Sequence, residues 1–210
     1  AHTALASILS NYDWNWAESE REYKLALGLS PEISASHFRY GQYLWAVGRL
    51  DESIAEMSKA VELEPLSLNT TANLALIYIS AGQLKKGLEL AKKNHDLEPG
   101  FVTGQLALGI AYNSNGLYDD AIRLSENSLQ SDPNNQHMLM AGGYAYARSG
   151  RRREAEEFIS KFKKIAKTQY TSSYYIATIY AALGEKDKAF AELESSFDDR
   201  DWWLIRMKFD

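Results

Sequence analysis

The chain has 210 residues, a formal net charge of −5 and no cysteine, which excludes disulfides, thiolate metal sites, cysteine nucleophiles and an overall basic field for nucleic acid. Hydrophobic residues make up 45% and charged residues 24%, which indicates a folded chain rather than a disordered one. No stretch approaches the roughly 18 apolar residues of a membrane-spanning helix, and the first residues lack the basic region of a signal peptide.

Apolar and small residues recur three or four positions apart along almost the whole chain, which predicts a succession of amphipathic helices. At the start of the second helix, Asn15 and Glu18 have the spacing of an N-cap residue and its partner, and we expect Trp16 to pack there as an apolar plug. In chain order, the predicted helices lie near residues 2–10, 16–29, 34–47, 51–63, 68–81, 84–97, 102–115, 118–130, 136–149, 152–166, 170–183 and 186–198.

The chain also repeats with a period of 34 residues. Each of the four prolines, from Pro31 to Pro133, is expected to stop the second helix of a pair, because proline has no N–H to donate. Five glycines keep the same period from Gly48 to Gly184 and are expected to end the first helix in a left-handed conformation. Because one helical hairpin cannot bury its apolar face alone, successive hairpins are expected to stack.

Some positions depart from this pattern. The first repeat needs one extra residue before its second helix, and Trp14 stands at its glycine position. Trp14 is therefore expected to pack either within the first repeat or against a neighbour that precedes the chain. In the second helices, four residues have unusual sizes for their positions, and looser or rotated packing is expected at Ala91, Asn94, Ser125 and Phe162.

These hairpins resemble the tetratricopeptide repeat, and the best match is HFRYGQYLWAVGRLDESIAEMSKAVELEP, residues 37–65. The resemblance implies an all-α, right-handed superhelical solenoid of about six antiparallel helix hairpins. It also implies a single array over residues 1–210, with a capping segment at 202–210 and repeats near 1–33, 34–67, 68–101, 102–135, 136–169 and 170–203.

The two ends of the chain carry a narrower resemblance. The stretches YDWNWAESEREYKLALGLSP and DDRDWWLIRMKFD are similar to the C-terminal repeat domains of bacterial regulators. In that family the partner domain is a winged-helix transcriptional regulator, a Ser/Thr kinase or a class III adenylate cyclase. The resemblance implies a fragment of a longer protein, either cytoplasmic or the periplasmic part of a membrane-anchored regulator.

No catalytic, cofactor or metal site is expected from the residue pattern. His2, His37, His95 and His137 lack the spacing of metal ligands and are expected to be packing residues. The basic run at 151–167 has no interleaved aromatic platform and precedes an acidic hairpin, so nucleic acid is not an expected partner. The sequence favours a non-catalytic protein whose expected partner is another protein or an extended peptide, or an output domain of its own that lies outside this chain.

The resemblance implies that the first helix of each pair lines a concave groove. Aromatic walls and amide or guanidinium donors in such a groove suit an extended peptide. The positions that face the groove hold Phe38, Arg39, Gln42, Trp45, Asn69, Asn73, Leu76, Ile79, Thr103, Leu106, Ile110, Asn113, His137, Met140, Tyr144, Arg148, Tyr174, Tyr175 and Thr178. We single out as binding residues Phe38, Arg39, Gln42, Trp45, Asn69, Asn73, Leu76, Asn113, Tyr144, Arg148 and Tyr174.

The C-terminal stretch RDWWLIRMKFD is too apolar to remain in water. Its residues Trp202, Trp203, Leu204 and Ile205 are expected either to cap the sixth hairpin or to form an interface with a partner. The alternative to peptide binding is therefore a module that forms homo-oligomers through its end hairpins.

Overall fold

The computed structural model describes residues 1–201, 203 and 204, and within these residues the chain is all α-helical with no strand. The predicted all-α helical solenoid is confirmed. The twelve helices are α1 (His2–Asn11), α2 (Trp16–Leu29), α3 (Ser34–Ala46), α4 (Leu50–Leu63), α5 (Leu68–Ser80), α6 (Leu84–Leu97), α7 (Val102–Ser114), α8 (Tyr118–Ser131), α9 (Gln136–Arg148), α10 (Arg152–Ile165), α11 (Ser173–Ala182) and α12 (Lys186–Asp198).

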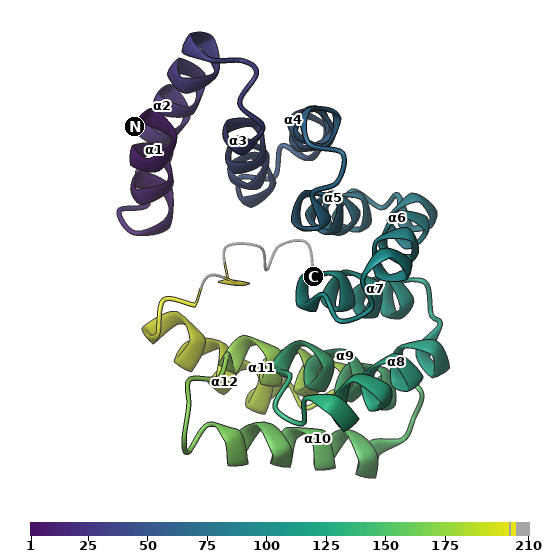
Figure 1. Ribbon diagram of the computed structural model, residues 1–210. Coiled ribbons are helices and arrows are strands. Elements are labelled where there is room, and N and C mark those ends of the chain that lie inside the picture. The colour runs from purple at the N-terminus through teal and green to yellow at the C-terminus, as the bar shows by residue number, and fades with distance from the viewer. Residues whose placement is uncertain (202, 205–210) are drawn as a thin grey trace.

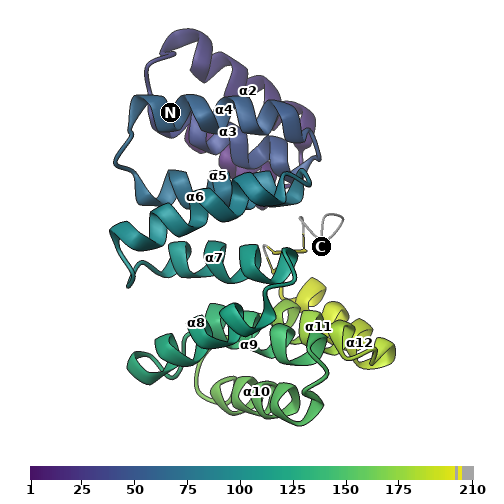
Figure 2. The ribbon, with the colours of Figure 1, turned by 90° about the vertical axis from the view of Figure 1, so that its right-hand side faces the viewer.

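Neighbouring helices pair into antiparallel hairpins that stack along a curved path (Figure 1). Helices α5, α7, α9 and α11 pack on one another along the inner side of the curve, while α4, α6, α8 and α10 lie on the outer side. The turned view shows the hairpins as successive layers (Figure 2). The curvature brings the loop between α1 and α2 back towards α12, so the two ends of the array approach each other across the concave side.

The glycine positions end the first helices as the sequence predicts. Gly48 has a φ of 84°, and the four glycines that follow it at the same period are also left-handed. Gly48 N–H donates to Trp45 O at 3.0 Å and Arg49 N–H donates to Leu44 O at 2.9 Å, which is the hydrogen-bond pair of a Schellman motif. This motif turns the chain sharply into the next helix.

Trp14 takes the place of glycine in the first hairpin, with a φ of 53°. Asn15 N–H donates to Leu9 O at 2.8 Å, and the loop between them is one residue longer than in the later hairpins. The extra residue that the period requires therefore lies inside this turn. Asn15 caps α2 as predicted, because its Oδ1 accepts from Glu18 N–H at 3.3 Å.

The second helices end at the same point of the repeat with or without proline. Helix α8 ends at Ser131, before Pro133, and α10 ends one period later at Ile165, although Lys167 stands where proline is expected. Packing of the hairpin is thus sufficient to define this helix end.

Helix α11 begins at Ser173, three residues later than predicted. The side-chain amide of Gln136 holds the preceding backbone extended, since it donates to Tyr170 O at 2.9 Å and accepts from Ser172 N–H at 3.2 Å. These contacts replace the first turn of the predicted helix.

Of the looser or rotated packing expected in the second helices, the looser packing is wrong. Ala91, Asn94, Ser125 and Phe162 are all fully buried. Asn94 Nδ2 donates to Leu68 O at 2.8 Å, and Ser125 Oγ donates to Met138 O at 2.6 Å. Each polar side chain thus bonds to the backbone of a helix that packs beside it, which keeps the joint close.

Two of the four histidines hold their hairpins together. His2 Nδ1 lies 2.6 Å from Glu22 Oε2 in the first hairpin, and His37 Nδ1 lies 2.6 Å from Glu56 Oε2 in the second. His37 also bonds to Pro31 O at 2.7 Å. Each ring therefore joins the first helix of its hairpin to the second helix, and His37 also joins α3 to the turn before it. Among the described residues, no three His, Asp or Glu side chains gather where they could hold a metal ion.

Candidate functional site

A pocket of about 210 Å³ opens on the concave side of the array. Helices α3, α5, α7, α9 and α11 each contribute side chains to it. Five of the singled-out residues meet here. The lining residues are Trp45, Leu76, Ile79, Ser80, Ile110, Asn113, Ser114, Met140, Tyr144, Tyr174, Tyr175, Thr178 and Trp203.

The walls of this pocket are apolar and aromatic, and no charged side chain lines it among the described residues. Trp45 spans the gap between α3 and α5, because its Nε1 donates to Ser80 Oγ at 3.0 Å. This bond fixes the indole plane at one end of the pocket. A rigid aromatic wall of this kind loses little conformational entropy when a ligand packs on it.

Two polar atoms at the pocket have no hydrogen-bond partner within the described part of the chain, Asn113 Oδ1 and Tyr174 OH. Asn113 is held in place because its Nδ2 donates to Ala141 O at 2.9 Å. Asn113 is 9% exposed and Tyr174 is 4% exposed. Unpaired buried polar atoms cost free energy, so a ligand that bonds to them gains more than one bound at a solvated surface.

Four other singled-out residues form a polar ladder on α3 and α5, beside the pocket rather than in it. Arg39 Nη1 donates to Gln42 Oε1 at 3.1 Å, and Gln42 Nε2 donates to Asn73 Oδ1 at 3.3 Å. Asn73 Nδ2 in turn donates to Asn69 O at 2.9 Å. These side chains already bond to one another, so they contribute a pre-ordered polar edge.

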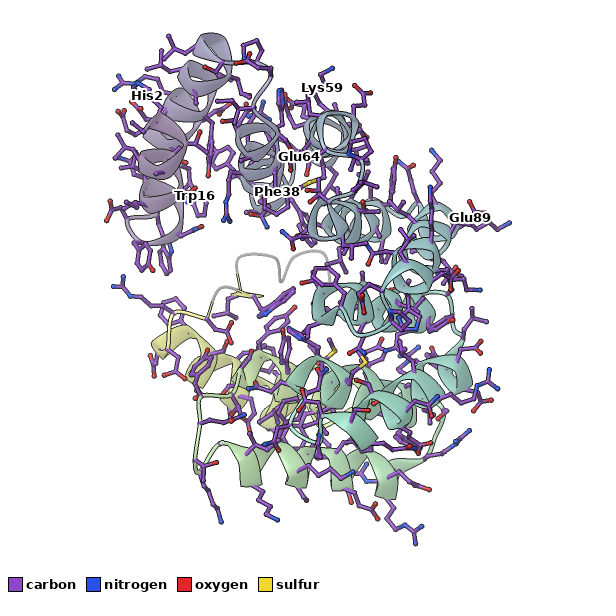
Figure 3. The ribbon with its side chains drawn as sticks, in the orientation of Figure 1. His2, Trp16, Phe38, Lys59, Glu64 and Glu89 are labelled. Carbon is purple, nitrogen blue, oxygen red and sulfur yellow. The ribbon has the colours of Figure 1, made fainter. Side chains whose placement is uncertain are left out.

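The remaining singled-out residues lie apart from the pocket. Phe38 is 8% exposed and the guanidinium of Arg39 lies 5.4 Å from its ring centroid, so Phe38 is part of the core beneath the ladder. Figure 3 shows Phe38 on the inner side of α3, whereas Lys59 and Glu89 project from the outer helices α4 and α6. Arg148 is exposed at the end of α9, and its Nε donates to Tyr118 OH at 3.4 Å.

Trp203 reaches the pocket from the C-terminal segment, a placement that the sequence did not predict. Its ring centroid lies 5.6 Å from that of Tyr175. Leu204 also packs on the core of the last hairpins. Trp202 and Ile205, which were expected together with Trp203 and Leu204 either to cap the sixth hairpin or to form an interface, lie outside the described residues. Ser80 and Ser114 were also missed, although both stand at a position of the repeat that faces the groove.

An ion-pair cluster joins the first two hairpins. Glu20 Oε1 lies 2.7 Å from Lys24 Nζ and 2.6 Å from Arg49 Nη1. These two cations lower the pKa of Glu20 to about 2. The cluster links α2 to the turn before α4 and so helps to fix the angle between the hairpins.

Comparisons with known proteins agree with this geometry. Residues 15–67 and 106–170, more than half of the chain, match the sequence model described as tetratricopeptide repeat. The chain belongs to the tetratricopeptide repeat family. Proteins of this family are generally non-catalytic scaffolds for protein interactions. No match is found among curated proteins.

Solved structures show the same repeat fold at low sequence identity. A tetratricopeptide repeat protein from Parabacteroides merdae has a TM-score of 0.76 at 16% identity, over 98% of this chain and 80% of its own. A thermophilic protein of the family from Thermus thermophilus has a TM-score of 0.65 at 20% identity, over 84% of this chain and 97% of its own. MamA from Desulfovibrio magneticus has a TM-score of 0.63 at 16% identity, over 81% of this chain and 98% of its own.

A second, wider hollow of about 840 Å³ lies where the two ends of the tetratricopeptide repeat array meet. Trp14 packs against the other end of the array, where its ring centroid lies 6.3 Å from that of Phe197 in α12. Figure 3 shows Trp16 at the end of the first hairpin that faces α12. Phe197 and its neighbour Phe190 remain 60% and 65% exposed, so this hollow is lined by aromatic rings that water still reaches.

Within the described residues, no helix of the array combines the length and the apolar character that a membrane-spanning helix requires.

Proposed function

We propose that this chain is the non-catalytic interaction module of a bacterial regulatory protein and that it captures an extended protein segment in its concave groove. The observation that carries the proposal is the apolar pocket in which Asn113 Oδ1 and Tyr174 OH lie buried without partners. The link to regulators, and with it a cytoplasmic location, rests on the similarity of the two chain ends to such repeat domains.

The mode of capture follows from the groove. An apolar or aromatic side chain of the ligand enters the pocket between Trp45 and Tyr174, where water is displaced from apolar walls. The ligand packs beside Asn113, whose Oδ1 has no partner among the described residues. The ladder from Arg39 to Asn69 lies alongside and offers polar groups to the extended backbone of the same ligand.

The test is a selection of displayed random-sequence peptides on the immobilised full chain, followed by calorimetry with the enriched peptides. Ser114→Arg places a long side chain at the exposed rim of the pocket without altering the core. Ser131→Arg is the matched control, because Ser131 is exposed at the corresponding end of the outer helix α8. We expect Ser114→Arg to weaken binding at least about tenfold, which is about 1.4 kcal/mol, and Ser131→Arg to leave it unchanged.

Equal binding by both variants would contradict the groove assignment. A circular-dichroism melt of each variant separates loss of the site from loss of the fold.

A second candidate function is self-association through the ends of the array. The observation that favours it is the hollow between Tyr12, which is 70% exposed, and the exposed rings of Phe190 and Phe197. Sedimentation of the full chain tests it. A dimer that Phe190→Glu and Phe197→Glu convert to a monomer supports self-association, and a monomer at all concentrations excludes it.

A further inference from the structure

The groove pocket contains a side chain from the chain's own C-terminal segment. Trp203 lines the pocket together with Trp45 and Tyr175, and its ring lies at 51° to that of Tyr175 with centroids 5.6 Å apart. This tilted arrangement is one that aromatic pairs favour. Trp203 therefore makes the kind of contact that an aromatic side chain of a bound peptide would make.

The turn before Trp203 positions it. Arg200 has a φ of 52°, and Asp201 N–H donates to Ser196 O at 2.9 Å, so the chain reverses sharply after α12. Asp201 is 7% exposed, and one carboxylate oxygen accepts from Ser172 OH. The other accepts from Trp203 N–H at 3.0 Å. A buried carboxylate thus fixes the direction in which the segment enters the groove.

Trp203 does not satisfy the polar atoms of the pocket. Trp203 and Leu204 are half-buried, and Asn113 Oδ1 and Tyr174 OH still have no partner among the described residues. A peptide that brings an aromatic side chain and a donor for Asn113 would satisfy groups that Trp203 leaves unpaired. Such a peptide can therefore displace the segment, although the segment is present at a high effective concentration.

We infer that Trp203 is an intramolecular ligand of the groove, and that it must leave before an aromatic-anchored peptide can bind. This inference rests on the proposed function, since it assumes that the pocket is the binding site. It assigns the ligand class, a segment with a large aromatic side chain, and a regulation in which occupancy by the chain's own segment weakens binding of that ligand.

The experiment uses a fluorescent peptide with the sequence of residues 199–210, added to the full chain. Trp203→Ala removes the resident side chain, and Leu66→Ala is the control, because Leu66 is 92% exposed between α4 and α5. We expect the peptide to bind Trp203→Ala at least about tenfold more tightly than the unmodified chain. Leu66→Ala should behave as the unmodified chain, and adding Ser114→Arg to Trp203→Ala should remove the gain.

A second measurement observes the resident side chain itself in the unmodified chain. With 5-fluorotryptophan incorporated, the ¹⁹F resonance of Trp203, assigned from Trp203→Phe, should move towards its solvent-exposed position when a selected peptide binds. A resonance that does not move, or equal peptide affinity with and without Trp203, overturns the inference.

The two proposals fail in different ways. If selected peptides bind in a manner sensitive to Ser114→Arg but the Trp203→Ala variant gains no affinity, the intramolecular ligand is wrong and the groove function stands. If selected peptides ignore Ser114→Arg, the groove function itself is wrong.

Discussion

The guanidinium of Arg200 lies over the indole of Trp14, 5.9 Å from the ring centroid, and so joins the last hairpin to the first. Both residues have left-handed backbones, with φ of 52° and 53°, and no other described non-glycine residue has a positive φ. A left-handed conformation costs an ordinary residue about 1–2 kcal/mol. The strain is located at the two turns through which the ends of the array meet.

Removing either partner of this contact should open the array. Trp14→Ala deletes the ring that meets both Arg200 and Phe197. We expect small-angle X-ray scattering to give a larger radius of gyration, while the melting temperature changes little, because an exposed cation–π contact contributes only about 0.5–1 kcal/mol. Leu66→Ala serves as the control, and a scattering curve identical to that of the unmodified chain would show that the end contact does not set the curvature.

Replacing Gly142 or Gly28 with alanine should change the free energy of unfolding in opposite directions. A Cβ at Gly142 would lie 2.8 Å from both Phe158 Cε1 and Ser125 Cβ, so Gly142→Ala overpacks the fifth hairpin. We expect a loss of about 1–3 kcal/mol in the free energy of unfolding. Gly28 lies in α2 with nothing within 4 Å of its added Cβ, and Gly28→Ala should gain about 0.5–1 kcal/mol. Urea denaturation of both variants measures the two effects, and a stable Gly142→Ala would contradict the close packing.

His137 should make the array less stable in mild acid. Burial lowers the pKa of His137 from 6.5 to about 4. Between these values the unfolded chain binds a proton that the folded chain does not, so stability falls as the pH falls from about 6.5 to about 4, by at most about 1.4 kcal/mol per pH unit. His137→Gln should flatten this part of the stability profile, and an unchanged slope would show that His137 does not contribute.

Glu20 should change the stability of the fold in a more acidic pH range than His137 does. Lys24 and Arg49 lower its pKa from 4.5 to about 2, so the ion-pair cluster stabilises the fold above about pH 4.5 and is lost as the pH falls towards 2. The side chain is 23% exposed, and solvent limits the contribution to about 1 kcal/mol. Acid titration of Glu20→Gln should lack this transition. Glu62→Gln, whose pair with Lys59 is exposed, is the control and should retain it.

The helices could be predicted because each hairpin repeats the same local code. The glycine at the end of α3 and the N-cap Asn15 act within one turn of the chain, so their effects follow from neighbouring residues. Where a prediction was wrong, distant contacts decided the outcome. Helix α11 starts late because Gln136, from the preceding hairpin, pairs with the backbone at 170–172.

The candidate site was predicted in part. Trp45, Leu76, Asn113, Tyr144 and Tyr174 meet at the pocket because they occupy groove-facing positions on stacked helices. The meeting of Trp14 with Phe197 and the entry of Trp203 into the groove depend on the curvature that accumulates over all six hairpins. No local pattern encodes that curvature, so these contacts could not be predicted from the sequence.

Peptide binding in the groove is tested most directly by photo-crosslinking of a selected peptide that carries benzophenone in place of its aromatic residue. We expect mass spectrometry of the full chain to locate the crosslinks on pocket residues such as Ile79, Met140 and Thr178, on the concave side. Crosslinks on the outer helices α4, α6 or α8 would contradict it.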